Sequence, residues 1–285
     1  MRGPVRRLGD IVARRIAHEV RRRDPEPEWI DTSPPTTYAI YAQIALLASR
    51  YRSDASNLTT AELRVFSQNG EDGVLAEIFG RIGVGGSSFV EFGVGDGSQC
   101  NTRFLVDVLG WSGVYFESSA VAFERLHRRL THREDVATVM AHVTPDNVDA
   151  LFAAAAVPSD FDVLSIDIDG QDYWVWKALV EYRPRVVVIE YNSAIPPTER
   201  LVEPCGHRSD RTSYLGASLG ALEKLAAVKG YQLVHTELAG INAFFVRDDL
   251  ATLFSRDDVV HRGPNFGLVG SGLWQYPGRE PFVEV

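Results

Sequence analysis

The sequence predicts an α/β fold in which a Rossmann-like, doubly wound sheet of seven strands carries helices on both faces and ends in an antiparallel strand. From residue 89 onward, short β-rich runs alternate with helical stretches, which is typical of a parallel sheet with right-handed crossovers. A glycine-rich turn follows the first run. Only LAGI (238–241) separates the last two runs, too few residues for a parallel crossover, so the last strand must return as a hairpin.

The strands are expected at FVEFG (89–93), GVYFE (113–117), ATVMA (137–141), DVLSID (162–167), RVVVIEYN (185–192), YQLVHTE (231–237) and NAFFVRDDL (242–250). The helical stretches between them are 101–110, 120–131, 147–156, 172–182 and 218–230. One more helix is expected within 66–83, where Ser67 or Asn69 could cap its start and Gly83 would end it.

Three segments are expected along the 285 residues: 1–60, 61–250 as the main domain, and a tail at 251–285. Residues 1–23 carry eight arginines between apolar residues that recur at helical spacing. This amphipathic helix would dock on its own protein or a partner subunit, or lie on a membrane surface. A linker (24–37) and an accessory helix (38–51) follow. The net charge of −9 leaves the rest of the chain strongly acidic, which disfavours a nucleic-acid partner.

The two cysteines, Cys100 and Cys205, form no CxxC motif, so we expect a reducing, cytoplasmic environment and no zinc site. The apolar run at 38–48 is too short to span a bilayer, and no transmembrane segment is expected. The tail at 261–278 could cover the site or mediate dimerisation, and a homo-oligomer is expected.

The turn VEFGVGDGSQ (90–99) directly follows the first strand. Gly93, Gly95 and Gly97 would let the backbone turn tightly and approach a ligand at the carboxyl end of the strands. Glu91 lies in the strand just before them, and Glu117 ends the second strand, where a carboxylate can accept both ribose hydroxyls of an adenosine ligand. The alternative is a tight strand-to-helix turn without a ligand.

VEFGVGDG followed by VYFE resembles the first two motifs of class I S-adenosylmethionine (SAM)-dependent methyltransferases. With FSQNGEDGVL upstream and SIDIDGQDYWVWKAL downstream, the chain resembles the FkbM-type methyltransferases over residues 66–247 and, more distantly, the macrocin-type sugar O-methyltransferases. The resemblance implies SAM as cofactor. It also implies that Gly93, Gly95 and Asp96 contact SAM. Glu117 would bind the ribose, and His142 and Val143 would lie near the adenine. Gln68, Asn69 and Asp72 could close over the cofactor or merely cap the helix.

Acidic and amide side chains end two neighbouring strands: Asp167 and Asp169 after the fourth, and Glu190 and Asn192 after the fifth. Parallel strands about 4.8 Å apart bring these groups into one crevice, and their oxygens suit Mg²⁺, Mn²⁺ or Ca²⁺. Resemblance to the macrocin-type enzymes implies that Asp167 is a metal ligand and Asp169 the base. After the fifth strand, however, this sequence has Glu-Tyr-Asn where the macrocin-type enzymes have two adjacent aspartates. Alternatively, the acids orient substrate hydroxyls without a metal, or cap the next helix.

The irregular insert 193–214 would select the substrate. Candidate acceptor contacts are His207, Arg208, Arg211 and Tyr214, with Tyr173 on the helix after the acids. His235, near the end of the sixth strand, is an alternative base. Most of the aromatic surface of Tyr173, Trp174 and Trp176 is expected to lie in the core.

These features predict an O-methyltransferase acting on a hydroxyl of a small or medium-sized metabolite, with N-methyl transfer as an alternative. The resemblance favours a sugar, a glycan unit or a polyketide-like natural product. An NAD(P)-dependent oxidoreductase would share the glycine turn and the ribose carboxylate, but the predicted final hairpin disfavours it. A binding or scaffold protein without catalytic activity is the other alternative.

Overall fold

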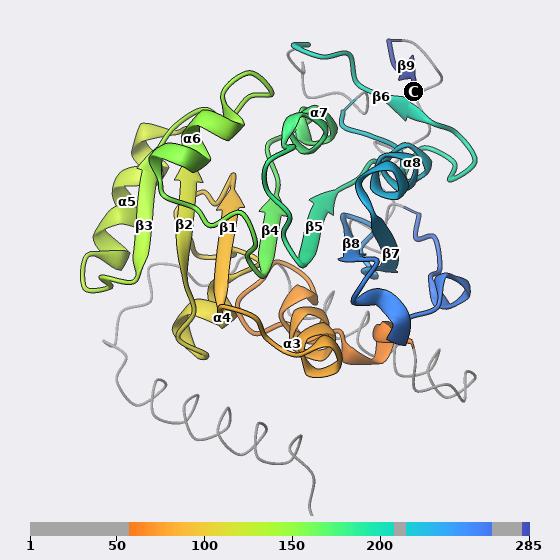
Figure 1. Cartoon of the computed structure of the whole chain (residues 1–285). Coiled ribbons are helices and arrows are strands. Elements are labelled where there is room, and N and C mark those ends of the chain that lie inside the picture. Colours follow the sequence, from red (N-terminus) through yellow and green to blue (C-terminus); the bar gives the residue numbers. More distant parts are fainter. Residues whose placement is uncertain (1–56, 208–214, 264–280) are drawn as a thin grey trace, which may run out of the picture.

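The computed structural model describes residues 57–207, 215–263 and 281–285, and Figure 1 shows their arrangement. The predicted basic helix (1–23), the linker and the accessory helix (38–51) lie outside these residues, as do residues 264–280 of the predicted tail and residues 208–214 of the 193–214 insert. No helix of the described part has the length and apolar character needed to cross a membrane.

Seven strands form one sheet in the order β3-β2-β1-β4-β5-β8-β7. Five are parallel neighbours, and β8 runs antiparallel between β5 and β7, which confirms the predicted doubly wound sheet with a reversed last strand. The strand bounds are β1 (Ser88–Phe92), β2 (Ser112–Glu117), β3 (Val136–Met140), β4 (Val163–Ile166), β5 (Val186–Glu190), β7 (Tyr231–Thr236) and β8 (Asn242–Arg247).

Helices cover both faces of the sheet (Figure 1). One face packs against α6 (Val148–Ala154), α7 (Asp172–Ala178) and α8 (Leu219–Lys229). The other packs against α3 (Glu71–Ile82), α4 (Arg103–Asp107) and α5 (Ala120–Leu130). Side chains alternate between faces along a strand, so the neighbours Phe244 and Phe245 of β8 belong to the two different cores.

The predicted helix ends are partly confirmed. Gly83 ends α3 with a φ of 71°, a conformation that favours glycine. The predicted cap of α3 is wrong, because Gly70 occupies the N-cap position, although the Ser67 hydroxyl still accepts a hydrogen bond from the Asp72 N–H group (3.2 Å). Asn69 is instead bonded to Glu71.

Smaller elements surround the sheet. The 3-10 turn η1 (Leu58–Ala61) contacts α3 and β7, while η2 (Ala251–Leu253) and η3 (Arg256–Asp258) follow β8. The strand β9 (Val283–Glu284) pairs with β6 (Leu201–Val202), so the last residues of the chain lie beside the insert that precedes α8.

The strand order reverses between β1 and β4. Helices leave the sheet in opposite directions at such a point, and the gap between them is where open α/β sheets bind ligands, at the carboxyl ends of the strands. Both the glycine turn after β1 and the acids after β4 lie at this edge.

Candidate functional site

The glycine turn brings the ends of β1 and β4 into contact. Gly93 has a φ of 70°, and a Cβ atom there would lie 1.5 Å from the carbonyl oxygen of Asp167. Gly95 also has a positive φ, of 57°. Glycine is therefore required at position 93 by its conformation and by the close approach of the two strands.

Glu117 at the end of β2 points toward this turn. Its Oε2 accepts a hydrogen bond from the Gly95 N–H group (2.7 Å), and its Oε1 accepts one from the Ser119 N–H group (2.6 Å). The side chain is 6% exposed. A carboxylate has about four acceptor positions, so two protein donors leave capacity for the hydroxyls of a ligand.

Glu91 is buried and holds the segment after the turn. It accepts hydrogen bonds from the N–H groups of Asn101 (2.8 Å) and Thr102 (3.0 Å), and from the hydroxyl groups of Thr102 and Ser165. Burial raises the pKa of Glu91. The residue thus fixes the start of α4 relative to β1 and β4, and it also borders the cavity described next.

A cavity of about 210 Å³ lies over the turn, and we call it the donor cavity. Its wall combines the turn, the end of β4 and the start of β8. The lining residues are Gln68, Glu91, Gly93, Val94, Gly95, Asp96, Ser98, Gln99, Cys100, Asn101, Asp167 and Asn242. Five of the predicted cofactor residues, Gln68, Glu91, Gly93, Gly95 and Asp96, therefore share one cavity.

The remaining predicted cofactor residues take other positions. Gly97 does not line the donor cavity; its φ is 75°, and a Cβ atom there would lie 2.6 Å from Leu126, so this glycine permits close packing of α5. Asp72 accepts hydrogen bonds from the N–H groups of residues 65–67 and so shapes the loop before α3. His142 is exposed just beyond β3, and its carbonyl oxygen accepts a hydrogen bond from Asn147.

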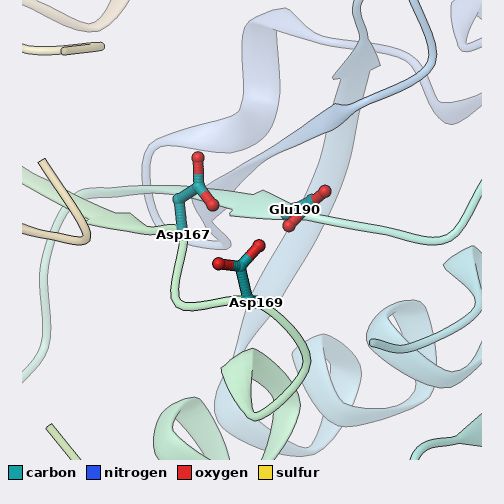
Figure 2. Close-up of side chains that lie close together, drawn as sticks. All are labelled: Asp167, Asp169 and Glu190. Atoms are coloured by element: carbon teal, nitrogen blue, oxygen red, sulfur yellow. The ribbon is translucent and has the colours of Figure 1, made fainter. Parts of the chain in front are cut away.

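Asp167, Asp169 and Glu190 converge at the ends of β4 and β5, and we call them the acid triad (Figure 2). One carboxylate oxygen from each lies within 4.8 Å of the others. Among residues 57–207, 215–263 and 281–285, none of the ion pairs involves any of the three. Within the part of the chain that the structure describes, the triad is therefore a cluster of acidic side chains without a salt bridge to a cationic side chain.

The electrostatics of the triad follow from this crowding. Burial, followed by the negative charges of Asp172 and Asp169, raises the pKa of Asp167 to about 8. Burial and the charge of Asp167 raise the pKa of Glu190 well above its usual range. A bound cation would reverse these effects, because an opposite charge favours the ionised carboxylate.

Asp169 has an unusual backbone, with a φ of 53°. Such a conformation costs about 1–3 kcal/mol in a residue other than glycine and is concentrated at functional sites. Asp172 stabilises it, since its two carboxylate oxygens accept hydrogen bonds from the N–H groups of Ile168 and Gly170 (both 2.9 Å). The loop thereby presents the exposed Asp169 at the carboxyl edge.

A second cavity, of about 30 Å³, lies beside the triad and is lined by Asp169, Gly170, Asp172, Glu190, Tyr191, Asn192, Ser193, Leu215 and Gly216. Asn192 borders it, but its Nδ2 group donates to the Leu215 carbonyl oxygen (2.9 Å) and its Oδ1 accepts from the Ala194 N–H group (3.1 Å). The predicted metal ligand Asn192 therefore also holds its own loop. Asp167 lines the donor cavity and belongs to the triad, so it joins the two cavities.

The predicted acceptor residues are only partly described. Arg208, Arg211 and Tyr214 lie outside the described residues. His207 is partly exposed, and its Nδ1 is 2.7 Å from a carboxylate oxygen of the fully buried Glu203. Glu203 lies behind the wall of the second cavity, because its other carboxylate oxygen accepts a hydrogen bond from the Gly216 N–H group (3.0 Å).

Tyr173 lies in the hydrophobic core and lines neither cavity, so the prediction that it contacts the substrate is not supported. Its position on the inner face of α7 explains the burial. Trp176 is also in the core, as expected, while the Nε1 group of Trp174 donates to the Glu203 carbonyl oxygen (2.7 Å).

His235 was predicted as an alternative base, but it lies away from both cavities. It is buried on β7, lines neither cavity, and its Nε2 lies 2.8 Å from Glu62 Oε1. Burial lowers the pKa of His235 to about 3, and burial raises the pKa of Glu62 to about 8. The pair is therefore uncharged near neutral pH and stabilises the contact between η1 and β7.

Sequence reasoning did not single out Asn242, Glu203 or a positioning role for Asp172. Asn242 reaches the donor cavity only because β8 runs antiparallel and so begins at the carboxyl edge. The hairpin signal at 238–241 implied this placement, but an asparagine at the start of a strand carries no chemical signature of its own.

A scan against models of protein families finds no match, and neither does a search of curated proteins. Solved structures similar to this chain include a putative sarcosine dimethylglycine methyltransferase from Galdieria sulphuraria (18% identity, TM-score 0.39, covering 57% of this chain and 61% of that one). Another is the O-methyltransferase from Bacillus cereus in complex with SAH (17% identity, TM-score 0.41, covering 76% and 91%).

The N-terminal domain of EvdMO1 with SAH bound is a third (12% identity, TM-score 0.42, covering 72% of this chain and 94% of that one). This chain spans about three fifths of the length of the Galdieria protein. All three TM-scores are below 0.5, so the functional inference depends on the site of this chain.

Proposed function

We propose that this protein is a SAM-dependent methyltransferase that methylates a hydroxyl group of a small or medium-sized metabolite. The observation that carries the proposal is the bond between Glu117 and Gly95 at the mouth of the turn, next to a cavity that leads to the acid triad. The carboxylate suits the ribose hydroxyls of SAM, and the glycine backbone permits close approach of the ligand.

The positions of the two cavities suit the reaction. The hydroxyl oxygen of the acceptor attacks the methyl carbon of SAM, the C–S bond breaks with its electron pair remaining on sulfur, and the hydroxyl proton passes to a base. Asp169 is the candidate base because it is exposed and lies at the second cavity. Asp167 lies where the donor and the acceptor would meet, and such positioning supplies much of the acceleration in methyl transfer.

The acid triad fits a divalent cation, Mg²⁺ or Mn²⁺. Its oxygens lie within 4.8 Å of one another, close to the roughly 4.2 Å between opposite ligands of Mg²⁺. Asp167 and Glu190 would hold the ion, with Asn192 at the rim of the second cavity, and Asp169 would lie beside the ion as the base. When bound, the ion would lower the pKa of an acceptor hydroxyl.

The metal proposal can be tested without an acceptor. Titration with Mn²⁺, followed by electron paramagnetic resonance, should show one site in the wild-type protein that Glu190→Gln weakens at least tenfold. Glu134→Gln, which changes an exposed acid away from the triad, is the matched control. Equal Mn²⁺ binding by all three proteins would rule out the triad as the metal site.

The acceptor class comes from the resemblance of the sequence to the FkbM-type and macrocin-type enzymes, which favours a sugar, a glycan unit or a natural product with free hydroxyls. The acidic chain, with its net charge of −9, repels nucleic-acid phosphates.

Calorimetric titrations of the wild-type protein with S-adenosylhomocysteine (SAH) and with NADH test the methyltransferase proposal. SAH should bind with a micromolar dissociation constant, and NADH should bind far more weakly. Tight binding of NADH without binding of SAH would favour an oxidoreductase. A non-catalytic binding protein would bind SAH but release none from SAM with any hydroxylated acceptor.

A further inference from the structure

Asn242 contributes an unusual polar group to the donor cavity. It is 4% exposed, lines the cavity together with Asp167 and Gln68, and lies directly opposite Glu190 in the β5–β8 pairing. The strand order β2-β1-β4-β5-β8 places it on the far side of the strand reversal from Glu117. The two residues therefore approach the site from opposite ends.

The orientation of the Asn242 amide is fixed by its neighbour. Its Nδ2 group donates to Glu71 Oε1 (2.9 Å), and because a carboxylate oxygen accepts hydrogen bonds, the nitrogen of the amide must face Glu71. The backbone N–H group of Asn242 donates to Glu237 Oε1 (3.1 Å). The residue is thus held in place from two sides.

This orientation leaves the Asn242 Oδ1 atom buried without a hydrogen-bond partner among the described residues. Buried carbonyl oxygens in native proteins nearly always have a partner, so an unpartnered Oδ1 in a residue that lines a cavity indicates that a ligand or an ordered water supplies the donor. The group that fits is an N–H or O–H donor, because Oδ1 only accepts.

The charge of the donor cavity indicates which kind of donor group would bind Asn242 Oδ1. Glu91 and Asp167 line the same cavity as Asn242, and Glu71 contacts its amide. The surroundings are therefore acidic, which favours a cationic donor and disfavours a carboxylate. With the ribose at Glu117, the amino-acid end of the methyl donor extends away from β2. This end carries an α-ammonium group and an α-carboxylate, and of the two only the ammonium group can donate a hydrogen bond to Oδ1.

We infer that the Asn242 carboxamide recognises the α-ammonium group of the methyl donor, with Oδ1 as the hydrogen-bond acceptor. The inference rests on the proposed function, since it assigns a specificity-determining residue to the same cavity. It gives the protein a means of selecting the complete amino-acid part of SAM over truncated thioethers of adenosine.

Two ligands separate this role from a structural one. SAH carries the amino-acid part, whereas 5′-methylthioadenosine has the same adenosine and thioether without it. In calorimetric titrations, Asn242→Ala should weaken SAH binding about tenfold and change methylthioadenosine binding less than twofold. Gln232→Ala is the matched control, because Gln232 is a carboxamide on the neighbouring strand β7 whose Nε2 donates to the Phe254 carbonyl oxygen, and it does not line the cavity.

The same titrations can also overturn the inference about Asn242. Equal weakening of both ligands by Asn242→Ala would mean that the residue only supports the fold. Unchanged SAH binding would mean that Oδ1 holds a water molecule and not the donor. If wild-type protein binds methylthioadenosine and SAH equally well, the inference fails while the proposed function stands; if it binds neither, the proposed function fails.

If Asn242→Ala does not fold, the inference can be tested with an altered ligand and the wild-type protein. The SAH analogue that lacks only the α-amino group should bind the wild-type protein about tenfold more weakly than SAH. Equal affinities of the two compounds would overturn the inference without any variant.

Discussion

Replacing Glu117 by alanine tests the adenosine end of the site. In the structure this carboxylate accepts two backbone hydrogen bonds, from Gly95 (2.7 Å) and Ser119 (2.6 Å), and it retains acceptor capacity for two ribose hydroxyls. A hydrogen bond to a charged group contributes about 1.5–3 kcal/mol. Losing two at the low end of this range costs about 3 kcal/mol, which corresponds to a roughly 150-fold weaker dissociation constant for SAH.

The assay is a calorimetric titration with SAH, accompanied by thermal unfolding to confirm that Glu117→Ala is folded. Glu124→Ala is the matched control, because Glu124 is an exposed acid on α5 and does not line the donor cavity. Glu117→Gln should lie between alanine and wild type, since one acceptor oxygen remains. A folded Glu117→Ala protein that binds SAH within threefold of wild type would refute the assignment of the ribose to this carboxylate.

Three further outcomes follow from the geometry. Gly93→Ala should destabilise the protein by about 2 kcal/mol or more and abolish measurable SAH binding, because its Cβ atom would collide with the Asp167 carbonyl oxygen. Gly86→Ala is the control, since its Cβ atom would make only an ordinary contact, and it should change neither stability nor binding. Equal melting temperatures and SAH affinities of the two variants would contradict the prediction. Asp169→Asn should lower kcat for a sugar acceptor about 10²–10⁴-fold with little change in SAH affinity, and an unchanged kcat would exclude it as the base. His235 has a folded-state pKa of about 3 against 6.5 when unfolded, so its stabilising effect is complete above pH 6.5 and is lost as the pH falls toward 3. When the pH is lowered from 7.5 to 5, the free energy of unfolding measured in urea should fall by about 2 kcal/mol more for wild type than for His235→Gln. Identical decreases would mean that His235 is not buried in its neutral form.

Much of the fold could be predicted because its signals are local. Alternating β-rich and helical runs set the order of elements, and the short 238–241 connection required an antiparallel hairpin of β7 and β8. The acids of the triad could also be brought together from the sequence. They follow two consecutive strands, and consecutive parallel strands end at the same edge.

The parts that could not be predicted depend on contacts between distant segments. Glu62 and His235 are 173 residues apart in sequence, yet their hydrogen bond assigns His235 to structure and not to catalysis. Tyr173 follows the acids directly, but the helical turn directs it into the core. Among the described residues, the Oδ1 atom of Asn242 on β8 has no partner, because Glu71 of helix α3 fixes the orientation of the amide.

A crystal structure of the protein with SAH tests the central claim most directly. We expect both ribose hydroxyls within hydrogen-bond distance of Glu117, the sulfur atom facing Asp167 and the ammonium group beside Asn242. Electron density for the adenosine elsewhere on the molecule, with Glu117 bonded only to Gly95 and Ser119, would contradict it.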